Sequence, residues 1–226
     1  MIIAIDGPAG SGKSTVAQLV AQRLGVLMLN TGAMYRAVGV AAHDQGLSLD
    51  DGRACAELAR SLDLDLDPEG RLLSRGQVLD MDGLLGEEPG AWASAVALLP
   101  DVRKVLVEVQ QDIGRRFDLV TEGRDTTTVV FPHADHKFFV TASLSERARR
   151  RMGQTGFHKN HEALMTEIEQ RDRQDRQREV APLVHAPDAH EVLTDGMRIE
   201  EVVDWILKQI QVGEGARPET QRGGRP

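Results

Sequence analysis

Residues 2–15 read IIAIDGPAGSGKST and set the architecture of the chain. The first four of these residues form a short apolar run, which is typical of a strand buried on both faces. Residues 7–14 then fit the pattern G-x-x-x-x-G-K-[ST], in which glycines let backbone N–H groups turn inward around phosphate oxygens. Helical spacing follows from Ser14 to Leu24, so the positive end of a helix faces the same anion. A strand before the loop and a helix after it predict a binding site for a nucleoside triphosphate.

Two side chains of this loop have a chemical role of their own. Lys13, interpreted as a phosphate ligand on the protein surface, supplies a positive charge to the β and γ phosphates. The Ser14 hydroxyl can bind Mg²⁺, so we expect Mg²⁺ as the metal cofactor and Ser14 as its ligand. The residues expected to bind the triphosphate are Gly7, Pro8, Ala9, Gly10, Ser11, Gly12, Lys13, Ser14 and Thr15.

The loop does not say what happens to the γ phosphate, so two functional classes stay open. One is a kinase that passes the phosphate to a small acceptor, and the other is a nucleotide switch or motor. A GTPase is expected to carry an N-K-x-D element, and none of the five lysines of the chain follows an asparagine. The residues alone therefore favour the kinase class.

The rest of the chain alternates strand and helix patterns as an α/β fold does. A second apolar run at 26–29 completes a strand–helix–strand unit, which implies a parallel sheet. Residues 62–67 read LDLDLD, the alternation of a half-exposed strand, so we expect a small antiparallel sheet inserted at 62–84. Further helices are expected at 31–43, 50–62, 90–98, 101–117, 161–179 and 199–212, with a basic helix ending near Met152. Further strands are expected at 118–121, 137–140 and 191–193.

Composition excludes several other classes of protein. The 226 residues carry 27 Lys+Arg and 35 Asp+Glu, a net charge of −8, which argues against a general nucleic-acid coat. Cys55 is the only cysteine, so no internal disulfide can form and a reducing compartment is expected. No window approaches the ~20 apolar residues of a membrane span, and the first residues lack the basic region of a signal peptide. These features predict a cytoplasmic protein that binds neither nucleic acid nor a membrane.

Arginines mark the side of the site that would hold a phosphate acceptor. Arg36 and Arg124 each come shortly after a predicted core strand, and ligands of doubly wound sheets bind at such strand ends. Arg171, Asp175 and Arg178 share one helix face at i, i+4 and i+7. A solvated helix face with internal ion pairs would give the same run, so the spacing alone leaves both interpretations open.

Four blocks of residues, in this order, resemble bacterial cytidylate kinases over about residues 1–210. They are Gly7 to Thr15, Leu29 to Arg36, Glu122 to Asp125 with Thr128 to Pro132, and Arg171-Asp172 running on to Leu183. Members of that family move the γ phosphate of ATP to CMP or dCMP, so the resemblance implies this reaction and these substrates. The alternatives are a kinase of another small acceptor and an ATP-dependent switch.

The resemblance also implies a domain organisation. It implies a P-loop kinase core with a parallel sheet flanked by helices, an inserted monophosphate-binding region with a small antiparallel sheet, and a short lid. The core then takes residues 1–32 and 118–212, with the lid at about 150–162, and the monophosphate-binding region takes 33–117. Residues 213–226 offer almost nothing to bury and are expected to be a disordered tail. The expected oligomeric state is a monomer.

Residue roles follow from the resemblance position by position. Arg36 and Arg124 match arginines that bind phosphate, and Ser94, Arg103 and Asp125 match residues that read cytosine. The full set expected to bind CMP is Thr31, Arg36, Ser94, Arg103, Gly123, Arg124, Asp125, Arg171, Asp175 and Arg178. The expected catalytic residues are Lys13, Arg124, Arg150 and Arg151.

The side chains of Ser94, Arg103 and Asp125 match the hydrogen-bonding groups of cytosine. A carboxylate and a hydroxyl can accept hydrogen bonds from the cytosine amino group, and a guanidinium can donate to N3 and O2 of the ring. Uracil inverts two of these positions and would leave Asp125 facing a carbonyl group.

Three positions depart from the family pattern. Asn30 stands where Asp is common, and residues 84–87 read LLGE where the family has an Ile-Arg-Thr stretch. Thr127 stands where Gly is usual, so we expect it to stiffen its loop.

Other polar residues keep an ordinary interpretation beside a functional one. The H-x-x-H pairs at 133–136 and 158–161 lack further ligands, so no zinc site is expected. Glu122 either holds a water bound to Mg²⁺ or is a plain surface residue. Arg147, Arg149, Arg150 and Arg151 are too many for one γ phosphate, so we expect at least two of them to face solvent.

Overall fold

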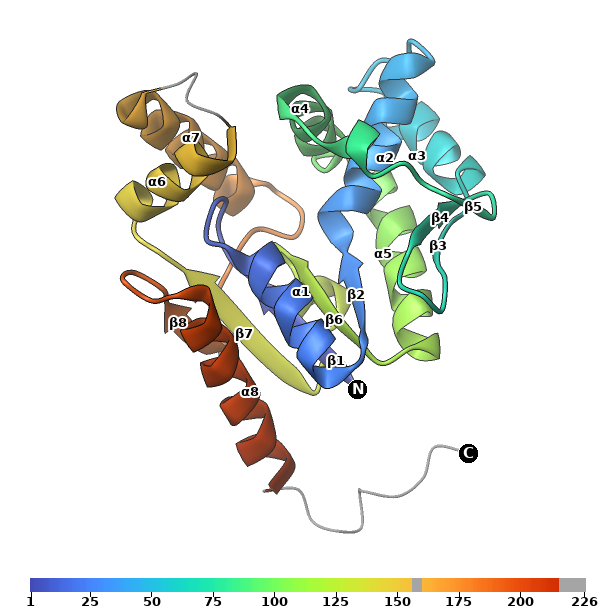
Figure 1. Ribbon diagram of the computed structural model, residues 1–226. Coiled ribbons are helices and arrows are strands. Elements are labelled where there is room, and N and C mark those ends of the chain that lie inside the picture. Colours follow the sequence, from blue (N-terminus) through green and yellow to red (C-terminus); the bar gives the residue numbers. More distant parts are fainter. Residues whose placement is uncertain (156–159, 216–226) are drawn as a thin grey trace.

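The computed structural model describes residues 1–155 and 160–215, and a parallel sheet forms its centre (Figure 1). Five strands lie in the order β2-β6-β1-β7-β8, and each neighbouring pair is parallel. The strands are β1 (Ile2–Asp6), β2 (Leu27–Asn30), β6 (Leu119–Gly123), β7 (His136–Thr141) and β8 (His190–Leu193). The predicted α/β core is confirmed, because the apolar runs are the strands and every predicted strand end lies within two residues of the observed one.

Helices cover both faces of this sheet. Helices α1 (Lys13–Leu24) and α8 (Ile199–Gly215) pack on the face that carries Ile3 and Ile5. Helices α2 (Thr31–Asp44), α3 (Gly52–Ser61) and α5 (Pro100–Arg116) share a second apolar cluster with Leu29 and Leu119. Both faces of the central strands are therefore buried, as their continuous apolar sequences require.

The alternating segment forms the inserted sheet that the sequence predicts. Strands β3 (Leu64–Leu66), β4 (Leu72–Ser74) and β5 (Gln77–Val78) pair antiparallel. A short helical turn, η1 (Asp82–Leu84), leads from this sheet to helix α4 (Glu87–Val96), which packs against α2. The insert thereby places α4 above the carboxyl ends of the core strands (Figure 1).

Helices α6 (Leu144–Thr155) and α7 (His161–Gln177) pack together on the other side of the phosphate loop (Figure 1). Helix α6 continues to Thr155 instead of ending near Met152, and residues 156–159 of the expected lid lie outside the described residues. Helix α8 continues to Gly215, so residues 213–215 are helical and not part of a disordered tail. The rest of that expected tail, 216–226, also lies outside the described residues. Among the helices of the described ranges, none is long and apolar enough to cross a membrane.

Candidate active site

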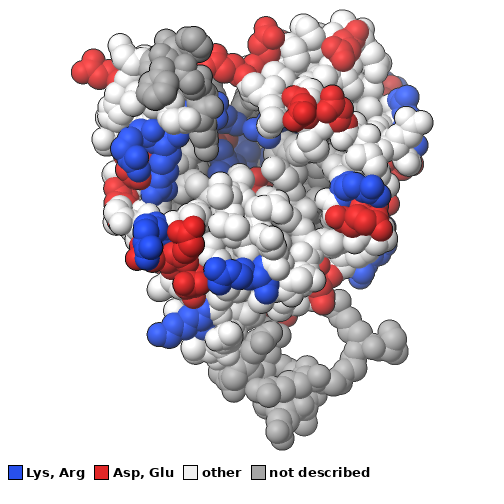
Figure 2. Space-filling model, in the orientation of Figure 1, with Lys and Arg blue, Asp and Glu red and all other residues white. Residues whose placement is uncertain are grey.

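A cleft of about 580 Å³ lies at the carboxyl ends of the parallel strands. In a doubly wound sheet this is where ligands bind. The phosphate loop, α2, α4 and the segment after β6 line it, together with α6, α7 and residues 194–202. Figure 2 shows the opening as a hollow with Lys and Arg side chains inside it. The cleft thus joins the two parts of the chain in which the sequence predicts donor and acceptor residues.

The phosphate loop has the backbone that its glycines allow. Gly10 and Gly12 have φ of +74° and +88°, values that other residues rarely adopt. A Cβ atom at Gly7 would lie 2.0 Å from the carbonyl oxygen of Val140, so β7 approaches the loop too closely for any side chain there. Residues 9–15 line the cleft, and helix α1 begins at Lys13, which directs its N-terminus at the same space.

Lys13 is buried, with an exposed fraction of 5%, so its interpretation as a surface residue is wrong. Its Nζ donates to the carbonyl oxygen of Pro8 at 3.3 Å and lies 3.9 Å from the Glu122 carboxylate. Burial and the nearby charge of Arg124 lower the pKa of Lys13 to about 7. Glu122 is itself 5% exposed, which excludes its interpretation as a plain surface residue. A phosphate group beside Lys13 would supply the negative charge that this ammonium lacks.

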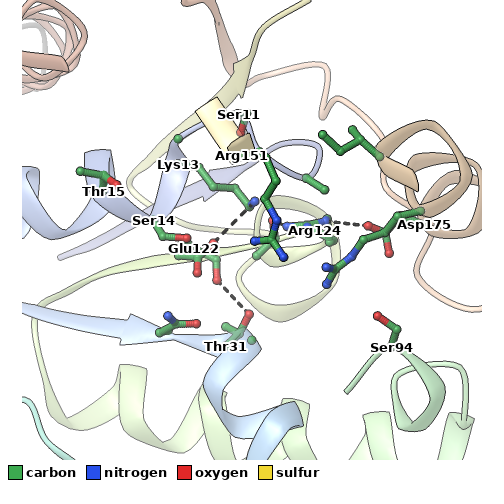
Figure 3. A pocket seen from close by; sticks show the side chains of 18 of the residues that line it. Ser11, Lys13, Ser14, Thr15, Thr31, Ser94, Glu122, Arg124, Arg151 and Asp175 are labelled. Carbon is green, nitrogen blue, oxygen red and sulfur yellow. Dashed lines mark hydrogen bonds and ion pairs between the residues drawn. The ribbon is translucent and has the colours of Figure 1, made fainter. Parts of the chain in front are cut away.

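Arg36, Arg124 and Arg171 line the cleft, and the charges of Arg124 and Arg171 act on Lys13. Figure 3 shows Arg124 near Lys13. The Nε atoms of Arg36 and Arg171 are buried and have no hydrogen-bond partner among the described residues. Burial lowers the pKa of Arg36, and burial together with the charge of Arg124 lowers the pKa of Arg171 to about 10. Arg124 is better compensated: burial opposes its charge, but Asp175 at 2.7 Å raises its pKa above the usual value. This part of the cleft holds more positive than negative charge, as a site for phosphate anions must.

The far end of the cleft is built from a buried carboxylate between two guanidinium groups. Asp125 pairs with Arg103, and its other oxygen accepts a hydrogen bond from Arg178 at 3.4 Å. Arg103 also lies over the Tyr35 ring, 5.6 Å from its centre. Ser94 lies on α4 at the opposite wall, where its hydroxyl donates to the carbonyl oxygen of Gly90 (Figure 3). The three residues assigned to cytosine by resemblance all line the cleft, and Arg103 and Asp125 are in direct contact.

The segment after β6 carries Arg124 and Asp125, and a carboxylate at the end of β1 holds it. Asp6 is fully buried and accepts four hydrogen bonds, two from Thr126 and two from Thr127, at 2.6–2.9 Å. A single π-helical turn, η2 (Thr126–Val130), results. Gly123 is required just before it, because a Cβ atom there would lie 2.8 Å from the Thr31 hydroxyl oxygen. That hydroxyl donates to the carbonyl oxygen of Glu122 at 2.8 Å.

The charged face of α7 turns toward the cleft and is not an ordinary solvated face. Arg171, Asp175 and Arg178 all line the cleft, whereas Arg173 and Arg176 are exposed. Of the four arginines at 147–151, only Arg149 is exposed, so the expectation that at least two face solvent is wrong. Arg147 is buried against the phosphate loop.

Arg150 and Arg151 both line the cleft beside the phosphate loop. Arg150 donates to the carbonyl oxygens of Ser11 and Thr194 and pairs with Glu146. Figure 3 shows the Arg151 side chain extending over Lys13 and toward Arg124.

Oxygen ligands suited to Mg²⁺ stand at the floor of the cleft. The Ser14 hydroxyl and the Glu122 carboxylate both line the cleft, and the Lys13 ammonium lies 3.9 Å from that carboxylate (Figure 3). Hydroxyl and carboxylate oxygens are what this hard cation prefers, so the residues present fit it. Asn30, where the family commonly has Asp, instead caps α2 by accepting a hydrogen bond from the Ala33 N–H at 3.0 Å. Within the described ranges, no group of three or more His, Cys, Asp or Glu residues is placed to hold a metal ion.

Comparison with solved structures supports the fold. A structure from Thermus thermophilus titled TT1252 superimposes with a TM-score of 0.50 at 21% identity, over 94% of this chain and 96% of that one. An uncharacterised protein from Eubacterium ventriosum gives a TM-score of 0.53 at 13% identity, over 94% and 98% of the two chains.

Comparison of sequences identifies the family. A bifunctional pantoate ligase/cytidylate kinase of Synechococcus elongatus is 48% identical over 92% of this chain, which spans only 41% of that relative's length. A cytidylate kinase of Symbiobacterium thermophilum is 42% identical over 93% of this chain and 96% of its own. The sequence model of the family described as cytidylate kinase matches residues 3–212. With its phosphate loop, its arginine-lined cleft and these relatives, the chain belongs to the cytidylate kinase family.

Proposed function

We propose that this chain transfers the γ phosphate of ATP to CMP or dCMP and releases ADP with CDP or dCDP. The observation that carries this proposal is the arrangement of the cleft: a phosphate loop at one end, under-compensated cations in the middle, and the Asp125 carboxylate between two guanidinium groups at the far end. Triphosphate, attacking phosphate and base would then follow one another along the cleft.

The donor side binds through the phosphate loop. Backbone N–H groups of residues 10–15 and the Lys13 ammonium surround the β and γ phosphates, with the N-terminus of α1 directed at them. Ser14 and Glu122 would hold Mg²⁺, which when bound neutralises charge on the β and γ oxygens. The lowered pKa of Lys13 rises when phosphate binds, so the ammonium is fully charged in the complex.

The acceptor phosphate is held by the arginine cluster. Arg36 and Arg171 present guanidinium groups whose Nε atoms have no hydrogen-bond partner among the described residues, and Arg124 is aimed from the other wall by Asp175. Bidentate contacts of this kind fix an anion in position as well as in charge. The attacking oxygen already carries negative charge, so no general base is needed and catalysis comes from positioning and charge neutralisation.

The base is recognised at the far end. Asp125 and Ser94 accept from the cytosine amino group, and Arg103 donates to the ring. In the free protein Arg103 and Asp125 pair with each other, which keeps both charges compensated until the base arrives.

We assign the residues of the cleft to the core, the monophosphate-binding region and the lid that the resemblance implies. Residues 33–117 supply Arg36, Ser94 and Arg103, and form the monophosphate-binding region. Residues 1–32 and 118–212 supply the remaining groups, with Arg150 and Arg151 at the start of a lid at about 150–162. A monomer as the working unit stays a prediction.

A transfer assay tests this proposal. Purified protein, ATP and Mg²⁺ are incubated with CMP, dCMP, UMP, AMP, GMP and sugar or acid acceptors, with an ATP-only control. Rapid formation of CDP and dCDP, with slow hydrolysis in the control, is the expected result. Fast ATP hydrolysis without any phosphorylated acceptor would instead indicate a switch.

A further inference from the structure

A buried ion pair holds one residue of the phosphate loop, Ala9, through both of its backbone polar groups. The Ala9 N–H donates to one carboxylate oxygen of Asp172 at 3.2 Å, and the Ala9 carbonyl oxygen accepts from Arg147 Nη1 at 3.0 Å. The same Arg147 nitrogen donates to the other Asp172 oxygen at 2.5 Å. Arg147 comes from α6 and Asp172 from α7, so both helices contact the loop at Ala9.

The contact between α6 and the loop continues over the next two residues. A Cβ atom at Gly10 would lie 3.2 Å from the Arg147 carbonyl oxygen, so the loop is packed directly against the helix. Arg150, one turn further along α6, donates to the Ser11 carbonyl oxygen at 3.0 Å. Two alternate carbonyl groups of the loop, those of Ala9 and Ser11, therefore each accept a hydrogen bond from an arginine of one helix.

The two held carbonyl groups also fix the direction of the N–H groups that follow them. The described chain has no cis peptide bonds, and in a planar trans peptide the C=O and the following N–H point in opposite directions. Because the Ala9 carbonyl points toward Arg147, the Gly10 N–H points to the opposite side of the loop. In the same way, the Ser11 carbonyl points toward Arg150, so the Gly12 N–H points away from Arg150. Both glycines line the cleft, so N–H groups turned away from these arginines are available to a ligand there.

Neither charge of the pair is free to meet a ligand. The two side chains are 7% and 8% exposed, and Arg147 also donates from Nε to the Ala142 carbonyl oxygen at 3.0 Å. Neither residue lines the cleft, so a direct contact with ATP is not their role. Apolar residues of similar volume are often at least as stabilising as a buried ion pair, so its distinctive effect is fixed geometry.

We propose that Arg147 and Asp172 are a positioning pair for the donor phosphates: they fix the two peptide groups on either side of Ala9, so that the loop presents its N–H groups to the triphosphate. This inference rests on the triphosphate site of the proposed function, and not on the identity of the acceptor.

The test is binding of Mg²⁺-ATP and of inorganic tripolyphosphate, measured by calorimetry on the full chain. We compare wild type with Asp172→Asn and Arg147→Lys. The asparagine puts an amide against Arg147, and the lysine keeps the charge but cannot reach Ala9, Ala142 and Asp172 together. Each variant is expected to bind both probes at least tenfold more weakly. The control variants Glu169→Gln and Arg173→Gln change exposed charges on α7 and should bind as wild type does.

Steady-state kinetics separate positioning from a general loss of folded protein. We expect KM for ATP to rise about tenfold in both variants, while KM for CMP changes less than threefold. A purely structural role would lower kcat in proportion to the unfolded fraction and leave both KM values unchanged, which would overturn the proposal. The double variant should be no weaker than the weaker single one, because the pair acts as a unit.

The outcomes also separate this proposal from the proposed function. A wild-type protein that binds tripolyphosphate, with variants that bind it equally well, contradicts the positioning pair alone. A wild-type protein that binds neither probe contradicts the triphosphate site itself. If Asp172→Asn does not fold, Arg147→Lys decides the question.

Discussion

The Thr127 hydroxyl donates a hydrogen bond to Asp6 over 2.6 Å, which ties the segment after β6 to the end of β1. Both residues are buried, and the Thr127 N–H donates to the same carboxylate oxygen at 2.8 Å. The family usually has Gly at this position, so this chain fixes the segment with a side chain in addition to the backbone. Arg124 and Asp125 lie just before it and gain their positions from this anchor.

Replacing Thr127 by Val should destabilise the protein, because it removes one of the two donors to that oxygen while keeping the side-chain volume. We expect a loss of about 1–3 kcal/mol, or a Tm lower by ~2–4 °C per kcal/mol, measured by thermal and urea unfolding. Thr128→Val is the matched control, since its hydroxyl makes only a 3.5 Å contact. Equal stability of wild type and Thr127→Val would show that the hydroxyl is dispensable.

Replacing Lys13 by Ala should abolish transfer and leave the fold intact. The ammonium is buried without full compensation, so its removal relieves a cost in the free protein and removes the charge that meets the triphosphate. Circular dichroism and Tm should match or exceed wild type, while kcat/KM falls below detection. Near-normal turnover of the purified variant would contradict the assignment of the loop.

The same group gives the free protein a pH dependence of stability. The pKa of Lys13 is lowered to about 7 in the folded state against 10.5 for a fully solvated lysine, so the unfolded state binds more protons between these values. Stability therefore rises with pH across this window, by at most about 1.4 kcal/mol per pH unit from Lys13, and no such gain occurs below pH 7. Urea unfolding of wild type and Lys13→Met at pH 7, 8 and 9 measures the difference. Parallel curves for the two proteins would contradict the lowered pKa.

Replacing Arg171 by Leu should stabilise the free protein and weaken acceptor binding. Burial and repulsion from Arg124 disfavour its charge, and the cleft offers it little compensation without an anion. We expect a gain on the order of 1 kcal/mol, about 2–4 °C in Tm, together with a CMP affinity at least tenfold weaker. Arg173→Leu, two residues further along α7 and exposed, should change CMP affinity little. A lower Tm for Arg171→Leu would show that the guanidinium is compensated within the protein.

Local patterns were enough to predict the core and the phosphate loop. Strand β1, the loop and α1 each have a short-range signal, namely an apolar run, glycine spacing and helical periodicity. The inserted sheet followed from the alternation at 62–67 in the same way. The predicted end of α6 was less accurate, because the local sequence does not mark where this polar helix stops.

The buried charges could not be predicted from local patterns. A run such as Arg171 to Arg178 is typical of a solvated helix, and only the tertiary fold decides which face is covered. One signal was present: Asp172 continues the buried stripe of Leu164 and Ile168 at intervals of four residues. A carboxylate in that stripe indicates a buried partner, which the structure identifies as Arg147 and the phosphate loop. Asp125 and Arg103, far apart in sequence, were assigned by resemblance alone.

The measurement that addresses base recognition most directly is kcat/KM for CMP and for UMP in three proteins: wild type, Asp125→Ala and Arg36→Ala. UMP would place a carbonyl group against Asp125 and an N–H against Arg103, leaving two buried polar groups unpaired at about 1–3 kcal/mol each. Wild type should therefore prefer CMP by at least roughly 10²-fold, within the range that polar pairing can reach. Asp125→Asn keeps the side-chain volume if the alanine variant does not fold.

We expect Asp125→Ala to lose most of this preference, because CMP turnover falls far more than UMP turnover. Arg36→Ala should weaken both acceptors about equally, since in the proposed arrangement Arg36 contacts only the acceptor phosphate. Equal losses for CMP and UMP in the Asp125 variants would contradict base recognition by Asp125 and leave it as a partner of Arg103 and Arg178 alone.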